Sequence, residues 1–402
     1  MQQQNKVFAL EGKVQHYQWG GFTYIPRLLS RENPSGQPFA EYWLGAHAQA
    51  PATIIGGTDL HRLLQEEPFL LGKKVQAGFG RLPYLLKVLD VKDMLSIQVH
   101  PTREDAIRGF TAENAAGVAL QAANRNYKDD NHKPELMAAL GDFYLLHGFR
   151  APASMTAILE EVPELRFLLP VFGEADYRTL YKTVMEMPDA EVIGHLQPLL
   201  HRIIPLYQAG ALSKTHPDFW AARAALTFNR PGSIDRGIFS VYLLNLVQMK
   251  EGQAIFQDAG ILHAYLEGQN VEIMANSDNV LRGGLTPKHI DVPELMKHVR
   301  FEPVIPYVQE PEPLNRSESA YLTPAGDFEL HRIRLQGDDY SLTASTVDIL
   351  LVMEGSVVAT EAGQPGIELQ RGDSLLLLDG AELNLASDGA AELYRATVPG
   401  LG

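Results

Sequence analysis

One stretch of the sequence decides the fold: GQAIFQDAGILH, residues 252–263. It can be laid on GDSLLLLDGAEL, residues 372–383, because each copy has a Gly-polar turn, an apolar run and a second Gly eight residues after the first. A matching apolar run precedes each copy, at 243–249 and at 349–353. Glycine tolerates the positive φ angles of tight corners, so this alternation suits a jelly-roll barrel. The pattern predicts two related barrels, although two short Gly-spaced segments can also match by chance.

The two copies differ at their last position. His263 of the first copy is aligned with Leu383 of the second. An imidazole can ligate a metal or move a proton, whereas a leucine can only pack. We therefore expect chemistry in the first barrel and a structural role for the second.

The rest of the chain surrounds these copies with three kinds of segment. Short strand-like runs and loops fill the first 150 residues, helical spacing broken by prolines fills 152–228, and strand patterns return at 239–249. A Pro-rich acidic linker, 309–313, precedes the last strands. We expect a mainly β protein with a helical insertion. Its predicted parts are a catalytic barrel in two pieces (1–150 and 237–308), a helical insertion (151–236) and a C-terminal barrel without metal ligands (309–402).

Composition excludes several classes of function. The 402 residues include 34 Lys and Arg, 49 Asp and Glu and no Cys, for a formal net charge of −15. The absence of Cys rules out thiol nucleophiles, iron–sulfur clusters and sulfur-ligated zinc. The negative charge argues against nucleic-acid binding and anionic membranes, but a local pocket can still attract a small anion. Without a signal-like start or a long apolar run, we expect a cytoplasmic protein.

The strongest local pattern is LSIQVHP, residues 95–101. On a strand, alternate side chains face opposite ways, so Ser96, Gln98 and His100 share one face. Gln98 and His100 could be metal ligands with Ser96 beside them in a pocket. Alternatively, the strand is half-exposed and its polar face is wet.

Two further segments offer metal ligands. Glu135 begins an apolar run after a polar loop, and His263 follows a Gly corner. Taken alone, each has an ordinary structural explanation: Glu135 could be an exposed carboxylate, and His263 could be a hydrogen-bonded histidine of the core. Together with Gln98 and His100 they form a nitrogen and oxygen set that suits Zn²⁺, and also Mn²⁺, Fe²⁺ or Co²⁺. Spacing alone does not show that the four converge.

Three basic residues have two readings each. Arg282 precedes two glycines, where it could bind phosphate or be solvated. Lys87 interrupts the apolar run of a predicted strand at 84–91, so it reaches the sheet edge or points into a polar cavity. Lys133 is an ordinary surface lysine unless a pocket holds it. The sequence has no Walker A, G-x-G-x-x-G or G-x-S-x-G motif, which disfavours nucleotide binding and serine hydrolysis.

The sequence resembles the type I phosphomannose isomerases over nearly its whole length. The resemblance rests on YQWG (17–20), EYWLGAH (41–47), PYLLKVL (83–89), LSIQVHP (95–101), DNHKPE (130–135), GILH (260–263) and NSDNVLRGG (276–284). It implies cupin-type barrels, one Zn²⁺ per chain held by Gln98, His100, Glu135 and His263, and an active-site Arg282. It further implies substrate-pocket roles for Lys87, Ser96, Lys133, Glu272 and Asp278. It is weakest in the helical insertion and the C-terminal barrel.

The activity implied by this resemblance is the interconversion of mannose 6-phosphate and fructose 6-phosphate through a cis-enediol. Zinc would act as Lewis acid, and a base near C1 and C2 would move the proton. We take Lys133 as the first candidate for the base, because a nearby metal ion favours its neutral form; Glu272 and His132 are rivals. We expect a sugar phosphate as the partner and a monomeric chain.

Two other functions stay open at this point. One is a metal-dependent dioxygenase or lyase of cupin type, which the Gln ligand disfavours. The other is a sugar-phosphate-binding regulator, which the intact ligand set and Arg282 disfavour.

Overall fold

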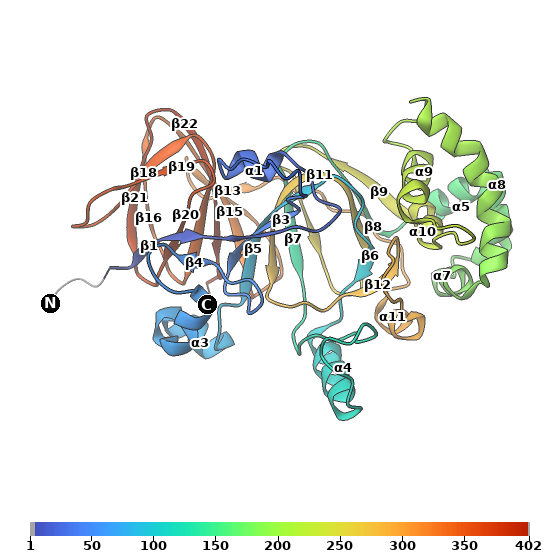
Figure 1. The fold of residues 1–402 in the computed structure, drawn as a ribbon, viewed down its shortest axis with the longest axis horizontal. Helices are drawn as coiled ribbons and strands as arrows, with labels where there is room; N and C mark the ends of the chain where they lie inside the picture. The colour runs from blue at the N-terminus through green and yellow to red at the C-terminus, as the bar shows by residue number, and fades with distance from the viewer. Residues whose placement is uncertain (1–4, 401–402) are drawn as a thin grey trace.

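The computed structural model describes residues 5–400 and is mainly β, with the helices of residues 152–243 gathered at one end (Figure 1). The first β region is a ten-stranded antiparallel sheet whose main path runs β10-β7-β11-β5-β3-β2. Its strands are β2 (Lys13–Gln15), β3 (Glu41–Gly45), β5 (Tyr84–Val91), β6 (Ile97–Val99), β7 (Glu135–Ala139), β8 (Phe143–Phe149), β9 (Leu244–Met249), β10 (Ala254–Gln257), β11 (His263–Ala275) and β12 (Leu281–Gly284). The strand predicted at 84–91 is confirmed as β5.

The second β region combines an eight-stranded sheet, β13-β14-β15-β22-β17-β20-β1-β4, with a four-stranded sheet, β16-β21-β18-β19. The bounds are β1 (Val7–Glu11), β4 (Thr53–Ile54), β13 (Glu312–Pro313), β14 (Glu318–Tyr321), β15 (Glu329–Gln336), β16 (Asp339–Thr343), β17 (Asp348–Glu354), β18 (Ser356–Glu361), β19 (Ile367–Gln370), β20 (Ser374–Leu377), β21 (Glu382–Ala386) and β22 (Ala390–Thr397). Strand β1 pairs with β20, so the first strand of the chain belongs to the C-terminal sheet.

The repeated segments have the same local structure. Gly252 and Gly260 have φ of 84°, and Gly372 and Gly380 have φ of 92° and 72°. These values lie in the left-handed region that favours glycine. Between each pair of glycines lies a four-residue strand, β10 or β20. The glycines therefore form corners on both sides of a short strand, as their spacing predicts.

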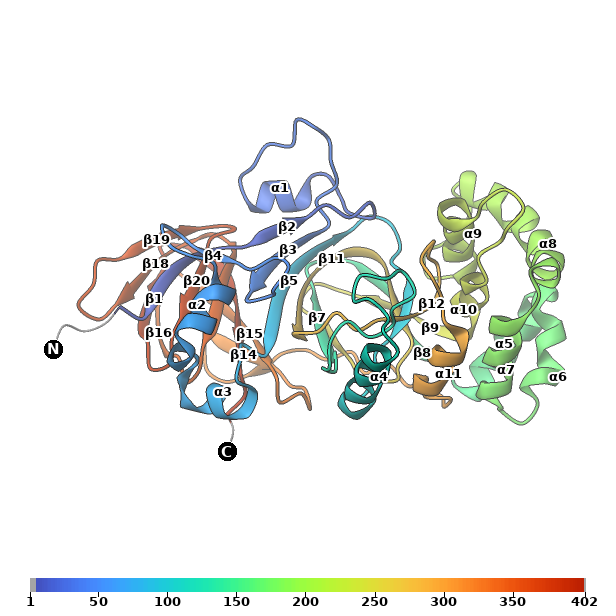
Figure 2. The same cartoon turned by 60° about the horizontal axis from the view of Figure 1, so that its bottom comes forward.

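Helices cover the far end of the first sheet (Figure 2). This helical region comprises α5 (Pro152–Glu161), η2 (Pro163–Leu168), α6 (Leu169–Phe172), α7 (Tyr177–Glu186), α8 (Asp189–Gln208), α9 (Pro217–Phe228) and α10 (Gly237–Leu243). Its apolar faces share one core with Ile97, Val99 and Leu281 of the neighbouring strands. Elsewhere lie α1 (Tyr24–Leu28), α2 (Leu60–Glu66), η1 (Pro68–Leu71), α3 (Gly72–Phe79), α4 (Arg103–Ala115) and α11 (Val292–His298).

The strand predicted over 239–249 is wrong in its first half. Residues Gly237–Leu243 form helix α10, and strand β9 begins only at Leu244. Every residue of α10 is buried, so the sequence shows an unbroken apolar run without the periodicity that separates a helix from a strand.

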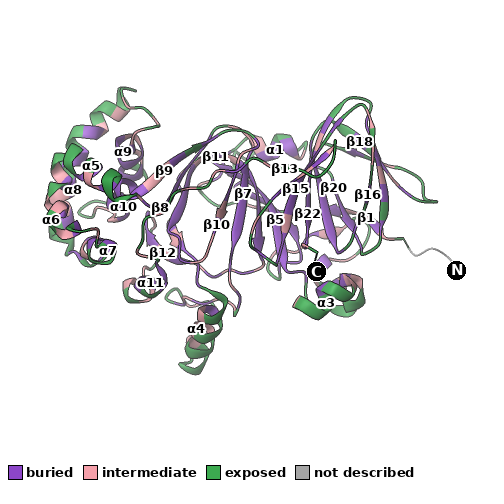
Figure 3. Cartoon of the chain, turned by 180° about the vertical axis from the view of Figure 1, so that it is seen from behind, coloured by how far each residue is buried: buried purple, intermediate pink, exposed green. Residues whose placement is uncertain are grey.

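The two β regions pack against each other over a shared apolar core. This core joins Leu86, Val88 and Ile273 of the first sheet with Ile349 and Tyr394 of the second. Figure 3 shows buried residues along the strands of both regions, whereas the outer sides of α3, α4 and α8 are exposed. Within residues 5–400, no helix combines the length and apolar character needed to cross a bilayer.

A buried ionic cluster crosses the C-terminal sheet. Arg395 Nη2 lies 2.6 Å from Asp348 Oδ2, and Arg395 Nη1 lies 3.0 Å from Glu318 Oε1. His331 Nδ1 lies 2.7 Å from the same oxygen of Glu318. Burial opposes ionisation of Glu318, but the hydrogen bonds of His331 and Tyr340 and the charge of Arg395 outweigh it and lower the pKa of Glu318 to about 2.

We expect Glu318→Gln to lower the free energy of unfolding by about 3 kcal/mol at neutral pH, because it leaves buried Arg395 less compensated. The pKa of Glu318 is lowered in the folded state, so its contribution is fully present above its ordinary value of 4.5 and is lost as pH falls toward 2. Urea unfolding from pH 7 to pH 3 measures this difference. The exposed Glu368→Gln of the same β region is the control. If the free energies of unfolding of wild type and E318Q differ by the same amount at every pH in this range, the pKa of Glu318 is not lowered by folding.

Candidate active site

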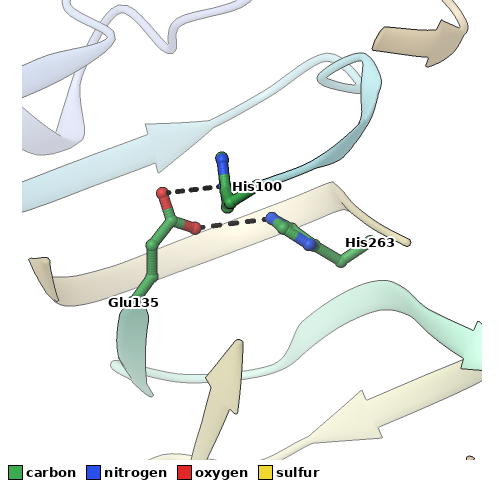
Figure 4. Close-up of side chains that lie close together, drawn as sticks. All are labelled: His100, Glu135 and His263. Carbon is green, nitrogen blue, oxygen red and sulfur yellow. Dashed lines mark ion pairs between the residues drawn. The ribbon is translucent and has the colours of Figure 1, made fainter. Parts of the chain in front are cut away.

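Three side chains from separate strands meet in the first β region. His100 follows β6, Glu135 begins β7 and His263 begins β11. Their ligand atoms, one per residue, all lie within 4.8 Å of one another (Figure 4). Glu135 Oε1 lies 3.4 Å from His100 Nε2, and Oε2 lies 3.4 Å from His263 Nε2. The structure thus brings together three of the four residues predicted to hold a metal.

The donor atoms of this cluster fit a cation. His100 Nδ1 lies 2.8 Å from the carbonyl oxygen of Asn279, and His263 Nδ1 lies 2.9 Å from that of Ile261. If these nitrogens donate, both Nε2 lone pairs face Glu135, as in metal sites whose ligating imidazoles are oriented by a second hydrogen bond. Buried His100 Nε2 and Glu135 Oε2 have no hydrogen-bond partner within residues 5–400. A bound metal would satisfy both atoms.

Protonation states in the cluster also suit a metal. Burial lowers the pKa of His100 to about 4, so its imidazole is neutral near pH 7. Burial opposes ionisation of Glu135, but the neighbouring Lys133 and His100 outweigh it and hold the pKa of that carboxyl well below its usual range. Neutral imidazole and ionised carboxylate are the forms that bind zinc.

Gln98 completes the predicted ligand set. It lies on β6, in register with His263 of β11 on one side and with Arg282 of β12 on the other. Its Nε2 lies 3.3 Å from His263 Nε2. Rotating the amide by 180° would place Oε1 at this position, so the side chain can offer an oxygen to the point where His100, Glu135 and His263 converge. Ser96 precedes β6 and is half-buried.

A second group of charges borders the cluster. Lys133 Nζ lies 2.9 Å from Glu135 Oε1. Lys87 Nζ lies 3.3 Å from Glu272 Oε1 and 3.4 Å from Glu41 Oε2. Lys87 and Glu272 are opposite each other in the pairing of β5 with β11. Buried Lys87 therefore points into a polar site, which decides between its two readings.

Asp278 joins this site through a residue that the sequence did not single out. Its Oδ2 lies 3.3 Å from Nε2 of the buried His47, whose ring packs edge-on against Trp43. Glu41 and His47 are missing from our predicted site, although both lie in the EYWLGAH motif. The available signal was a carboxylate at the start of an otherwise apolar strand, where burial of a charge requires a partner.

Arg282 is placed by contacts between β12 and the helical region. Asp235 Oδ1 accepts hydrogen bonds from the backbone N–H groups of Gly237 (2.8 Å) and Leu285 (2.9 Å), and Oδ2 accepts one from Thr286 (3.1 Å). A Cβ on Gly284 would lie 2.4 Å from the Cα of Gly237, so the two backbones touch. Leu285 adopts a φ of 54°, a strained value for a residue with a side chain. Asp235 thus fixes the end of the strand that carries Arg282.

Comparisons with known proteins agree with this geometry. The family model described as phosphomannose isomerase type I, catalytic domain, matches residues 7–152. The mannose-6-phosphate isomerase of Escherichia coli K12 is 35% identical over 382 residues, covering 92% of this chain and 94% of the relative. The chain belongs to the type I phosphomannose isomerase family. The human mannose-6-phosphate isomerase is also 35% identical, over 408 residues, with 92% and 93% of the two chains covered.

Solved members of the phosphomannose isomerase family share the whole fold. A crystal structure of the enzyme from Salmonella typhimurium, described as bound to its substrate fructose 6-phosphate and to zinc, has a TM-score of 0.86 at 33% identity and covers 98% of this chain and 100% of its own. A second structure, of mannose 6-phosphate isomerase with zinc and yttrium, has a TM-score of 0.86 at 34% identity, with the same coverage. The resemblance inferred from the sequence motifs is confirmed.

Proposed function

We propose that this chain is a zinc-dependent isomerase that interconverts mannose 6-phosphate and fructose 6-phosphate. The observation that carries the proposal is the buried His100–Glu135–His263 cluster, bordered by Lys87 and Lys133. Membership of the phosphomannose isomerase family gives this cluster its reaction class.

The metal would be held by His100, Glu135, His263 and Gln98. Zinc bound there supplies Lewis-acid polarisation of a substrate oxygen, which stabilises negative charge that develops during isomerisation. The chain's own residues supply the remaining chemistry.

We assign the proton transfer to Lys133. A base removes the C2 proton of the open-chain aldose while the aldehyde oxygen takes a proton, which gives a cis-enediol with a C1=C2 double bond. A proton then returns to C1 as the C2 hydroxyl gives up its own proton and becomes the ketose carbonyl. Lys133 is nine-tenths buried and its Nζ lies beside the cluster. The rivals have other partners: His132 Nε2 lies 2.8 Å from Asp327 Oδ2, and Glu272 accepts a 2.7 Å hydrogen bond from Tyr265.

Substrate binding falls to the charges around the cluster. Arg282 is substantially buried, and burial lowers its pKa, with no neighbouring carboxylate compensating within the described residues. An uncompensated guanidinium favours an anionic ligand such as a phosphate or an enediolate oxygen. We propose that Lys87, Ser96, Glu272 and Asp278 bind the phosphate and hydroxyl groups.

The finer architecture and setting are part of this proposal. We propose that the two β regions are cupin-type jelly rolls, with 1–150 and 237–308 forming the catalytic one, 151–236 the insertion and 309–402 the C-terminal one. Two strands depart from this division, since β1 and β4 of the first 150 residues are part of the C-terminal sheet. We further propose a monomeric, cytoplasmic enzyme.

The test is incubation with mannose 6-phosphate in ²H₂O, with and without a chelator. We expect chelator-sensitive formation of fructose 6-phosphate carrying deuterium at C1, because a base that exchanges its proton with solvent delivers deuterium. Binding without turnover would overturn the isomerase. Turnover without deuterium would overturn the enediol route.

Asp235→Ala should reduce kcat by about 10²-fold, because a catalytic group displaced by about 1 Å loses a factor of this size. The variant removes two hydrogen bonds to the residues that follow β12 and one to the first residue of α10. Steady-state kinetics and zinc content measure the effect, and zinc content should not change. Asp218→Ala is the matched control. Asp218 is a buried carboxylate of the same helical region, bonded to Tyr242 at 2.7 Å rather than to β12. Equal kinetic losses in both variants would show that Asp235 acts only through stability.

A further inference from the structure

A cavity of about 620 Å³ lies outside the proposed active site. Its walls come from the α1 segment, the end of β5, the middle of β11, helix α9 and the loop before β20. Figure 2 shows α1 on the outer side of β2 and β3. This volume falls within the range of small-molecule binding sites.

The cavity is basic in a strongly acidic protein. Four cationic side chains line it, against two carboxylates, while the chain carries a net charge of −15. Arg223 is already engaged, since it forms an ion pair with Glu267. Arg27, Lys92 and Arg371 form no ion pair within residues 5–400, although Lys92 Nζ lies 4.3 Å from the ring centroid of Phe22. Three cations from three separate segments are therefore available to an anion.

The lining also includes hydrogen-bonding groups of a different kind. Asp90 is only 4% exposed, and its Oδ1 accepts a 2.7 Å hydrogen bond from Gln269 Nε2. Asp90 and Gln269 lie directly opposite each other in the pairing of β5 with β11. A carboxylate held beside an amide is an arrangement that binds the hydroxyl groups of a sugar or polyol. A carboxylate repels phosphate, so Asp90 favours a hydroxyl group over a phosphate as its own partner.

The cavity and the proposed active site lie on opposite faces of the same two strands. Lys87 and Glu272 form one opposed pair of β5 and β11, and Asp90 and Gln269 form another, three residues away along each strand. Side chains alternate faces along a strand, so an odd separation places the two pairs on opposite faces. A ligand in the cavity therefore does not occupy the substrate position.

We propose that this cavity is a second ligand site that binds a phosphate ester bearing free hydroxyl groups. Arg27, Lys92 and Arg371 hold the phosphate, and Asp90 and Gln269 accept and donate hydrogen bonds to the hydroxyls. The site is independent of the isomerase reaction and has its own ligand.

Calorimetric titration of the full-length chain tests the site with three probes: glucose 1-phosphate, inorganic phosphate and glucose. We expect glucose 1-phosphate to bind more tightly than either part alone. Arg27→Ala/Arg371→Ala should weaken glucose 1-phosphate and inorganic phosphate by about tenfold or more, because two charge-assisted contacts are lost. Asp90→Asn should weaken glucose 1-phosphate but not inorganic phosphate.

Two further variants make the outcome decisive. Arg62→Ala/Arg316→Ala removes two exposed arginines that do not line the cavity and should bind all probes as the wild type does. Arg282→Met disables the proposed active site, and the cavity should still bind glucose 1-phosphate. Loss of binding in Arg282→Met with retention in Arg27→Ala/Arg371→Ala would overturn the second site, as would no binding to the wild type at millimolar concentration. The isomerase activity of Arg27→Ala/Arg371→Ala is measured separately. Because the cavity is independent of the isomerase reaction, failure of the proposed function would not by itself bear on the second site.

Discussion

Replacing His100 with alanine is expected to lower kcat/KM by about 10³-fold or more, because Lewis-acid stabilisation by a metal is worth several kcal/mol and each 1.36 kcal/mol is a factor of ten. The variant removes one of the two imidazoles that converge on Glu135. Kinetics and zinc content by elemental analysis should fall together. Thermal unfolding with added zinc should show a smaller stabilisation than in the wild type.

A second buried histidine provides the control for this experiment. His331→Asn also removes a buried imidazole, but one that pairs with Glu318 in the C-terminal sheet. It should keep its zinc and its turnover below its unfolding temperature. If H100A retains stoichiometric zinc and near-normal turnover, the cluster is not the metal site.

Lys133→Met is expected to lower kcat by about 10²- to 10⁴-fold, the range for loss of a general base, with little change in KM. The methionine keeps the length and apolar stem of the side chain but cannot accept a proton. Zinc content should stay at the wild-type level, because Lys133 is not among the proposed ligands. Deuterium incorporation from ²H₂O should fall in proportion to turnover.

The Lys133→Arg variant tests whether Lys133 is needed as a base or only for its positive charge. Arginine keeps the charge beside Glu135 but does not lose its proton in proteins. If charge alone is needed, K133R should recover turnover; if Lys133 is the base, it should be as slow as K133M. Wild-type turnover in K133M would move the role to Glu272 or His132.

Much of the fold was predictable because local patterns and tertiary structure agree. The Gly-flanked repeats are bounded by left-handed glycines, and the apolar run around Lys87 is strand β5 along its full predicted length. The helix α10 was not predictable from pattern, since its residues are buried on all sides and show no amphipathic period. The placement of β1 was hidden for another reason, because strand pairing over such a distance leaves no local trace in sequence.

Part of the candidate site was also predictable from local patterns, and part depends on tertiary structure. Gln98 and His100 show as polar residues on an alternating strand, but their approach to Glu135 and His263 depends on pairings between β6, β7 and β11. His47 was missed because its signal lies in a tertiary contact, the 3.3 Å approach to Asp278. A single histidine after an apolar strand has no distinguishing neighbour in sequence.

The pairing of β1 with β20 has a consequence for biosynthesis. The hydroxyl of Ser374 donates to the carbonyl oxygen of Leu10 across 364 residues of chain. At about 5–20 residues per second, the ribosome needs roughly 20–70 s to make that intervening chain. During this time the hydrogen-bonding edge that β1 will offer to β20 has no partner, and the C-terminal sheet cannot close around it. Strand β4 can pair with the other edge of β1 early in synthesis, so the nascent chain carries one unpaired strand edge through most of its translation, and we expect a chaperone that shields this edge to improve its yield.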